Sequence, residues 1–505
     1  MKTNKLVAVG ATALGSLLTL TAWAKSERFV QVYIGGQLQE EYVASRIDHI
    51  DVVDRIVPPE APAGVTATFA DGRVCLRWDE ADGAAYNVYR SADRETYVLI
   101  AGNLHTNGYT DEEPLQGYNY YLVKSVDDAG ESAVGVAALV SASQSGFVTG
   151  TLCGHRDETD SQWWVYGPFS STTGFRHEGT LAFDPLHPER LYAVYDTWYG
   201  QLFDEKAGKI DQLDLESCTH SRLLSGTSFG DEQRLRNCAF TGDGRYMLVS
   251  SDSNTDGYSS PGVWIVERVL SGAFTDNRRL IKRLALYKQC NSVAVHPVNG
   301  EVYFSSYENG KLFRLDLDKY FETSGQWTGL AGDYCFEEVF GMDDPSWEFS
   351  IVIHPSGDYA YLNCINRNCI YRTDYNHETH RFGAPYRVAG RMFNMGFADG
   401  TADDAVIGRP YQGVFVKNPD YAGTDDEYDY YFTDSYNCCV RRLTPGSTVN
   451  TVAGRVPDAG GNICGYADGE DALFGGVSGI AYDERTETFY VLDHDNRCVR
   501  TLRKK

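Results

Sequence analysis

The feature that most constrains the fold of this chain is an internal repeat that fills residues 144–505. Six short apolar runs recur there, and each is followed by a turn and a second predicted strand. Repeats of this kind bury their apolar faces by packing side by side around an axis, as the blades of a β-propeller do. We therefore predict an all-β chain whose larger domain has six blades. The runs lie at 180–185, 238–244, 292–297, 350–355, 413–419 and 479–483.

A second recurring pattern marks a blade-closing strand. It consists of an apolar residue, a small residue and glycine, and only three strands are predicted in the last repeat. Residues 147–154 have the alternation expected of the missing fourth strand. We expect them to pair with the C-terminal strand and close the ring, which removes free sheet edges. The pattern occurs at 152–154, 224–226, 330–332, 388–390 and 452–454.

The last two repeats share further residues. Asp434-x-x-Asn437 and Asp493-x-x-Asn496 are each followed, after two intervening residues, by Val-Arg. Each of these motifs has an Ala-Asp-Gly sequence upstream, at 398–400 or 467–469. Together these motifs resemble NHL repeats. The resemblance implies an NHL-type six-bladed β-propeller over residues 144–505.

Residues 58–143 contain seven short alternating runs, which predict a β-sandwich. The Pro-rich entry at 58–62, Trp78 on the second run, the sequence Tyr86-Asn-Val-Tyr-Arg90 and Gly130 resemble a fibronectin type III domain. Domains of that family usually act as spacers or docking modules. The resemblance therefore implies no chemistry in this segment.

Residues 1–24 predict a signal peptide that lies outside the fold. Lys2 and Lys5 precede an apolar stretch, and Ala22-Trp-Ala24 offers small residues for cleavage. The stretch is shorter than the ~20 residues that span a bilayer, so we expect no transmembrane segment after signal removal. Residues 25–57 predict a short β leader with two strands around Gly35-Gly36 and a third at 47–53. We expect export to the periplasm or the cell exterior.

Charge and cysteine content limit the partners and cofactors. The formal net charge of −25 disfavours nucleic acid, because phosphate binding uses clustered lysine and arginine. Cys369, Cys439 and Cys498 recur at one position of the repeat, too far apart on neighbouring blades for disulfides. We expect them to be buried free thiols. The chain has no Cys-x-x-Cys pair, so the sequence gives no support to a structural zinc site.

Polar residues directly precede the apolar inner runs, where they would line the mouth of the propeller channel. Glu178, Asn237, Asn291 and Glu348 offer carboxylate and amide oxygens, the ligands that Ca²⁺ prefers. The order Glu-Gly, Asn, Asn resembles six-bladed calcium-dependent gluconolactonase and paraoxonase-like hydrolases, although Phe349 stands where that family has aspartate. The resemblance implies a calcium site. The alternative is a polar channel that holds only water.

Aromatic residues offer a second candidate site. Aromatic side chains on propeller loops stack on sugar rings, while neighbouring polar groups bind sugar hydroxyls. The alternative is that these rings fill the loops and the contact between the two domains. The candidate ligand-binding residues are Trp163, Trp164, Tyr166, Trp198, Tyr411 and Gln412.

The sequence leaves two functions open. Motifs for a serine nucleophile, a metalloprotease or a phosphate-binding loop are absent, and His177 is the one candidate base near the channel mouth. The favoured hypothesis is a non-enzymatic envelope protein that binds a glycan or a protein partner on a propeller face. The alternative is a calcium-dependent hydrolase or a polysaccharide lyase that acts at the channel mouth.

Overall fold

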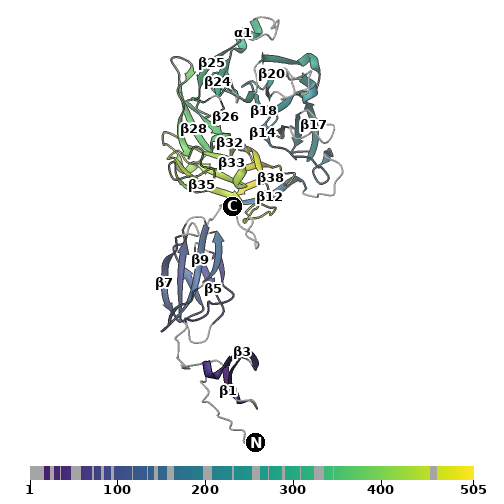
Figure 1. The fold of residues 1–505 in the computed structure, drawn as a ribbon. Helices are drawn as coiled ribbons and strands as arrows, with labels where there is room; N and C mark the ends of the chain where they lie inside the picture. The colour runs from purple at the N-terminus through teal and green to yellow at the C-terminus, as the bar shows by residue number, and fades with distance from the viewer. Residues whose placement is uncertain are drawn as a thin grey trace. The chain divides into compact units, whose positions relative to one another are not determined.

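The computed structural model describes residues 16–505, except for 23–27, 47–57, 81–84, 92–95, 142–145, 156–163, 197–207, 253–261, 323–334, 455–462 and a few shorter gaps. Strands account for nearly all of the regular structure (Figure 1). The described residues contain one α-helix, α1 (Leu317–Glu322). None of their helices has the length and apolar character needed to span a membrane.

The N-terminal part forms a three-stranded antiparallel sheet. Strands β2 (Arg28–Ile34) and β3 (Gln37–Val43) form the hairpin that the leader sequence predicts. Strand β1 (Ser16–Ala22) pairs with β2, although it lies in the segment expected to stay outside the fold. That segment alternates leucine and threonine, which suits a strand as well as a signal peptide. The strand predicted at 47–53 lies outside the described residues.

The next part is a β-sandwich. One sheet has the order β4-β5-β8, and the other contains β7, β6, β9 and β10, with β11 also paired to β9. Trp78 is buried and packs edge-on against Tyr86, with ring centroids 5.3 Å apart. This arrangement agrees with the predicted fibronectin type III-like fold. The strands are β4 (Thr66–Ala70), β5 (Arg73–Arg77), β6 (Ala85–Ser91), β7 (Val98–Leu104), β8 (Gly108–Asp111), β9 (Tyr118–Asp127), β10 (Gly130–Glu131) and β11 (Val136–Ser141).

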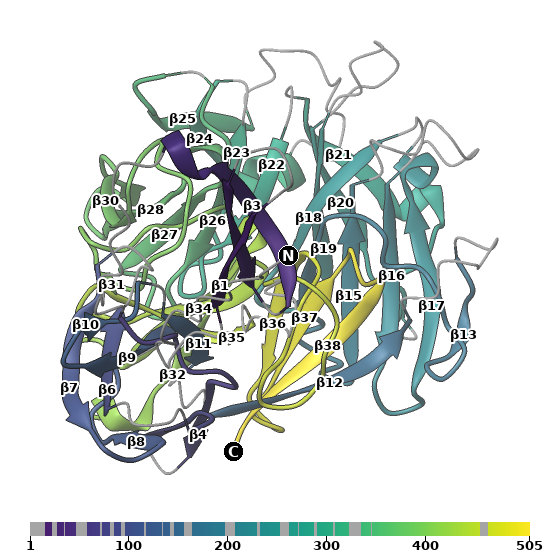
Figure 2. The same ribbon diagram turned by 60° about the horizontal axis from the view of Figure 1, so that its bottom comes forward.

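The remaining strands form six sheets, the blades of the predicted propeller (Figure 2). Blade 1 contains β13 (Gly167–Pro168), β14 (Gly179–Phe183), β15 (Arg190–Tyr195), β16 (Lys209–Asp214) and β17 (Thr219–Ser225). Blade 2 contains β18 (Arg234–Phe240), β19 (Tyr246–Asp252), β20 (Gly262–Glu267) and β21 (Ile281–Leu286). Blade 3 contains β22 (Cys290–Val295), β23 (Val302–Ser306), β24 (Lys311–Leu315) and β25 (Phe336–Gly341).

Blades 4 to 6 complete the ring. Blade 4 contains β26 (Phe349–Ile353), β27 (Tyr359–Cys364), β28 (Cys369–Asn376), β29 (Arg381–Phe382) and β30 (Tyr386–Gly390). Blade 5 contains β31 (Gly400–Thr401), β32 (Pro410–Lys417), β33 (Tyr428–Asp434), β34 (Cys439–Leu443) and β35 (Thr448–Gly454). Blade 6 contains β36 (Val477–Asp483), β37 (Thr488–Asp493), β38 (Cys498–Lys504) and, from the start of the propeller, β12 (Phe147–Gly154).

The predicted ring closure is confirmed. Strand β12 pairs antiparallel with β38, with Phe147 opposite Lys504 and Gly154 opposite Cys498. Figure 2 shows the two strands side by side. One strand of each blade contacts its counterparts in both neighbouring blades, all the way around the ring: β14, β18, β22, β26, β32 and β36. They are therefore the inner strands.

The apolar core lies between neighbouring blades. Tyr192 and Val194 of blade 1 pack with Met247 and Val249 of blade 2 in one buried cluster. Another cluster joins blade 6 to blade 1, through residues such as Leu492 and Leu181. Each blade is therefore stabilised by both neighbours, as expected for a closed ring of repeats.

The NHL-like motif residues form equivalent hydrogen-bonded clusters in blades 5 and 6. Asp493 accepts hydrogen bonds from the backbone of Gly475 at 2.9 Å, from Asn496 at 2.8 Å and from Arg500 at 3.0 Å. Arg500 also pairs with Asp468 of the upstream Ala-Asp-Gly sequence at 2.6 Å. The motif therefore fixes the loop that leads into the inner strand. In blade 5 the corresponding cluster contains Asp434, Asn437, Arg441 and Asp399.

The closing glycines have a steric explanation. Gly154 and Gly454 have φ values of +84° and +90°, and a Cβ atom there would lie 2.3–2.4 Å from a carbonyl oxygen of the adjacent turn. One predicted closing strand differs, because the outer strand of blade 3 is Phe336–Gly341, whereas 330–332 lies outside the described residues. The three repeat cysteines are buried and free, as predicted. One disulfide, Cys438–Cys464, was not foreseen.

Candidate functional site

Bulges in the inner strands place side chains at the mouth of the channel. Asn237 lies within β18, three residues after its first residue, and the register of β18 shifts between Leu235 and Asn237. Similar shifts bracket Asn291 in β22 and the Tyr411-Gln412 pair in β32. A bulge leaves its extra residue out of the ladder and redirects its side chain. The bulges therefore interrupt the regular alternation of side chains between the two faces of the strand at Arg236, Asn291 and Tyr411.

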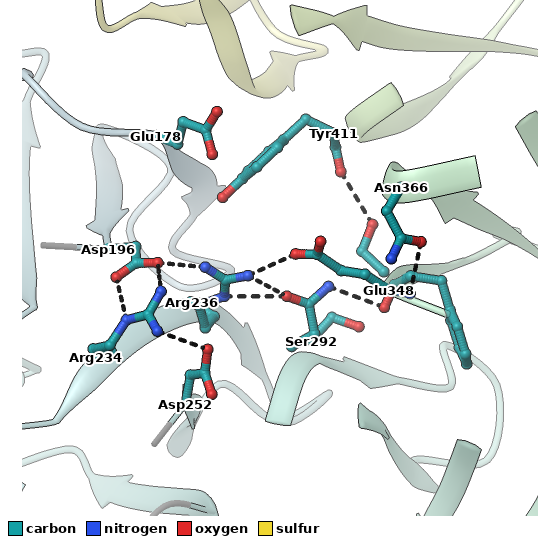
Figure 3. Close-up of polar contacts among 12 residues, drawn as sticks. Glu178, Asp196, Arg234, Arg236, Asp252, Ser292, Glu348, Asn366 and Tyr411 are labelled. Carbon is teal, nitrogen blue, oxygen red and sulfur yellow. Dashed lines mark hydrogen bonds and ion pairs between the residues drawn. The ribbon is translucent and has the colours of Figure 1, made fainter. Parts of the chain in front are cut away.

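Arg236 is the centre of the polar network at this mouth (Figure 3). Its guanidinium donates to Asp196 of blade 1, to Asn291 at 2.9 and 3.1 Å, and to Glu348 at 2.7 Å. Arg234 adds a bidentate pair with Asp196 at 2.9 and 2.5 Å. One guanidinium therefore joins residues from blades 1 and 3 and the segment before blade 4.

The electrostatics of this network favour full ionisation. Burial alone would raise the pKa of Asp196, but the Arg236 and Arg234 guanidiniums hold that pKa below its usual range. Burial likewise opposes the charge on Arg236, and the negative charge of Asp196 keeps its pKa raised. A buried pair of this kind is costly to break, because either partner alone would be an uncompensated charge.

A second ion pair lies nearer to solvent. Arg409 pairs with Glu178, and the side chains are 35% and 30% exposed. The backbone N–H of Arg409 donates to Asp434 of the NHL-like motif at 2.8 Å, so the motif positions this arginine. The buried Tyr411 ring lies beside Glu178, with its hydroxyl end between Glu178 and Arg236 (Figure 3). Partly exposed charged groups held in fixed positions are suited to hydrogen-bonding a polar ligand.

The four predicted metal ligands are only partly brought together. Asn291 and Glu348 meet at Arg236, and Glu178 pairs with Arg409. The Asn237 side chain accepts a hydrogen bond from the backbone of Val293 at 2.9 Å, as a link between blades 2 and 3. Both carboxylates of this set thus contact arginine. In the described part of the chain, no three His, Cys, Asp or Glu residues are grouped to hold a metal ion. Calcium binding by these residues stays a prediction.

The interior of the channel near Arg236 is small. A cavity of about 30 Å³ is lined by Arg236, Asn237, Asn291, Tyr411 and other residues, which is room for about one water molecule. Gln412, predicted to bind ligand, accepts from the backbone of Leu181 and Ile480 and donates back to Leu181, each at 2.9 Å. Its amide thus joins three blades. The cavity beside Arg236 has no room for a sugar ring.

His177 and Trp164 stack beside this mouth, with ring centroids 5.9 Å apart. Burial lowers the pKa of His177 to about 4, so the imidazole is neutral at neutral pH. The Lys209 ammonium lies 3.7 Å from the centroid of the Trp164 ring, and Gly174 approaches the same ring. Trp164 is therefore in close contact with protein groups. A base role for His177 and sugar stacking by Trp164 stay predictions.

Tyr166 belongs to a buried network. Its hydroxyl donates to Asp211 at 3.3 Å, and the same carboxylate pairs with Nε2 of His220 at 3.0 Å. Nδ1 of His220 contacts the Thr172 hydroxyl, which donates to the Val165 carbonyl. The Thr172–His220–Asp211 order resembles a catalytic triad, but all three residues are buried. This network therefore anchors the segment before β14. Trp163 and Trp198 lie outside the described residues.

Sequence reasoning missed the arginines and Asp196. Arg234 and Arg236 are two residues apart on a strand, a spacing that ordinarily places two side chains on one face. That spacing was the available signal, and the bulge that carries Arg236 was not readable from the sequence. Asp196 lies just after β15, and only the fold brings it to the start of β18.

Comparisons with known proteins find several solved Bacteroides proteins that are similar to this chain. No family model matches it. A crystal structure from Bacteroides thetaiotaomicron, described as a "putative phosphatase", is 33% identical, with 88% of this chain and 97% of that chain covered and a TM-score of 0.66. Two auxiliary nutrient binding proteins, from Bacteroides thetaiotaomicron and Bacteroides ovatus, are 28% and 27% identical; the alignments cover 87% and 89% of this chain and 97% and 99% of theirs, each with a TM-score of 0.59.

A curated relative matches only locally. An amylopullulanase of Thermoanaerobacterium saccharolyticum is 35% identical over 81 residues, which are 15% of this chain and 6% of that enzyme. The chain therefore matches only a small part of this relative. The identity with the first structure extends over almost its whole length, and on that basis this chain belongs to the same protein family as that Bacteroides thetaiotaomicron protein.

Proposed function

We propose that this chain is an exported nutrient-binding protein of the bacterial envelope, and that it binds a carbohydrate at the mouth of its propeller channel. The observation that carries the proposal is the partly exposed Glu178–Arg409 pair above the buried Arg236 network. Carboxylate and guanidinium groups bind vicinal sugar hydroxyls, and their positions here are fixed by the blades. The names of the two nutrient binding proteins support a binding role.

The enzymatic alternatives have weaker support. A calcium-dependent hydrolase needs a cation close to carboxylates that here contact Arg236 and Arg409. A lyase needs an accessible base, and the favoured candidate, His177, is largely buried against Trp164. The phosphatase name belongs to the relative, and the described residues hold no grouped metal ligands. A binding role requires none of these features.

A glycan screen tests the proposal. The purified protein is applied to a glycan array with calcium and with chelator, and the strongest hit is titrated by calorimetry. Glu178→Gln and Arg409→Met should each weaken binding roughly tenfold or more, as expected when a charge-assisted hydrogen bond is lost. Glu216→Gln, on an exposed turn of blade 1, is the matched control. No glycan binding in either buffer, or binding unchanged by both mouth variants, would contradict the proposal.

A further inference from the structure

A separate pocket lies between blade 2 and helix α1, away from the residues of the channel mouth. It has a volume of about 230 Å³. Its lining is made of aromatic, apolar and charged side chains: Tyr246, Tyr320, Phe321, Ile265, Leu280, Arg245, Arg279, Lys282 and Glu267. Helix α1 lies at the rim of the propeller beside β20 and β24 (Figure 1). The volume is below the ~300–1,000 Å³ of pockets for drug-sized ligands, and so suits a single ring.

Strand pairing builds the floor of this pocket. Tyr246 on β19 is opposite Glu267 on β20, and Lys282 on β21 is opposite Ile265 on β20. Positions 265 and 267 lie on the same face of a strand, so all four side chains project to one side of the blade. Tyr320 of α1 is buried in the same apolar cluster as Ile265. The floor is therefore rigid.

The aromatic wall is accessible. Phe321 is 44% exposed, and its ring lies 5.4 Å from that of Tyr246. Such apolar rings pack against the C–H face of a sugar. The Arg245 guanidinium lies 5.0 Å from the Tyr246 ring and pairs with Glu267 at 2.8 Å. This pair forms one edge of the pocket.

The charge of the pocket is opposite to that of the chain. Arg245, Arg279 and Lys282 line it with one acid, Glu267, although the whole protein carries −25. Arg245 is paired with Glu267, whereas Arg279 and Lys282 are exposed and form no ion pair with any described residue. Two cations are thus available beside two aromatic rings. A neutral ligand would leave both cations unused.

The geometry points to a second binding site here, for an acidic monosaccharide unit, meaning one sugar ring that carries a carboxylate, sulfate or phosphate group. Phe321 and Tyr246 contact the ring, and Arg279 and Lys282 bind the anion. This site is additional to the proposed one at the channel mouth and does not depend on it.

Titration of the full chain with small ligands tests this site. Glucuronate, glucose 6-sulfate and glucose 6-phosphate are the probes, and glucose and inorganic sulfate are the controls. We expect at least one acidic sugar to bind more tightly than either control, and its affinity to fall as salt rises. Lys282→Gln, Arg279→Gln and Phe321→Ala should each weaken it, the charge variants roughly fivefold to tenfold. Which probe binds best identifies the acidic group.

Two variants separate this site from other sources of binding. Lys319→Gln removes the same charge from the exposed part of α1 outside the pocket and should leave the affinity unchanged. Glu178→Gln should also leave it unchanged, so failure at the channel mouth is distinguishable from failure here. The inference is overturned if no acidic sugar binds, if glucose or inorganic sulfate binds equally well, or if Lys282→Gln and Phe321→Ala have no effect.

Discussion

At the scale of single residues, Arg236 is the residue that connects the polar network at the channel mouth. Its guanidinium contacts Asp196, Asn291 and Glu348, and its side chain is only 9% exposed. Arg236→Met would remove the arginine that pairs with Glu348 and would leave Asp196 with Arg234 as its remaining arginine partner. We expect the propeller to lose about 3–5 kcal/mol of unfolding free energy, as is usual when one partner of a buried pair is removed. Calorimetry of the variant measures the change.

The matched control is Lys311→Met in blade 3. Lys311 pairs with Glu338 at 2.6 Å, but both side chains are more than one-third exposed. Removing a pair of this kind should cost less than about 1 kcal/mol. If Arg236→Met costs no more than this control, the Arg236 network does not hold the blades together.

His177 provides a pH-dependent prediction. Burial lowers its pKa to about 4, whereas an unfolded histidine titrates near ~6.5, so the unfolded state binds the proton first as the pH falls. Stability should therefore drop between pH 7 and 5, by about 1–2 kcal/mol from this residue. His177→Phe keeps a ring against Trp164 and cannot titrate, and its melting temperature should fall less over that range. The control is His377→Phe, at an exposed histidine, and its melting temperature should depend on pH as that of the parent protein does. Equal pH dependence in all three proteins would show that His177 is not the source of the loss in stability.

At the scale of elements, β12 decides whether the ring closes. It supplies the fourth strand of blade 6 and pairs with β38 along its whole length. Deleting residues 146–154 would expose the edge of β38 and part of the apolar cluster that contains Cys153 and Val499. We expect an insoluble or molten propeller, seen as lost near-ultraviolet circular dichroism. A deletion variant that melts cooperatively at the parental temperature would contradict this role.

The elements also show what the sequence can and cannot predict. The six inner strands, ring closure and the free repeat cysteines were predictable, because apolar periodicity and turn residues report local structure. The NHL-like motifs were also readable from the sequence. In the structure, their aspartates Asp434 and Asp493 accept backbone hydrogen bonds from the loops that lead into the inner strands. The Arg236 network was not predictable, since it depends on bulges and on contacts such as Arg236 to Glu348, 112 residues apart. Glu178 and Glu348 were candidates from the sequence, but their arginine partners, Arg409 and Arg236, were missed.

At the scale of the whole molecule, the sandwich and the propeller each have their own core. Trp78 is 3% exposed and packs on Tyr86 within the sandwich. Trp78→Ala should destabilise the sandwich by about 3–5 kcal/mol, as for other buried aromatic residues. Differential scanning calorimetry should then show one transition at lower temperature and the propeller transition unchanged. A joint shift of both transitions would show that the two parts unfold together.

The account depends above all on where the ligand binds. The most direct test is a crystal structure of the protein with the tightest-binding glycan from the array. We predict ligand density within hydrogen-bond distance of Glu178 and Arg409, above the Arg236 network and with no sugar ring inside the channel. Density confined to the sandwich, or to a propeller surface that touches neither residue, would contradict the proposed function.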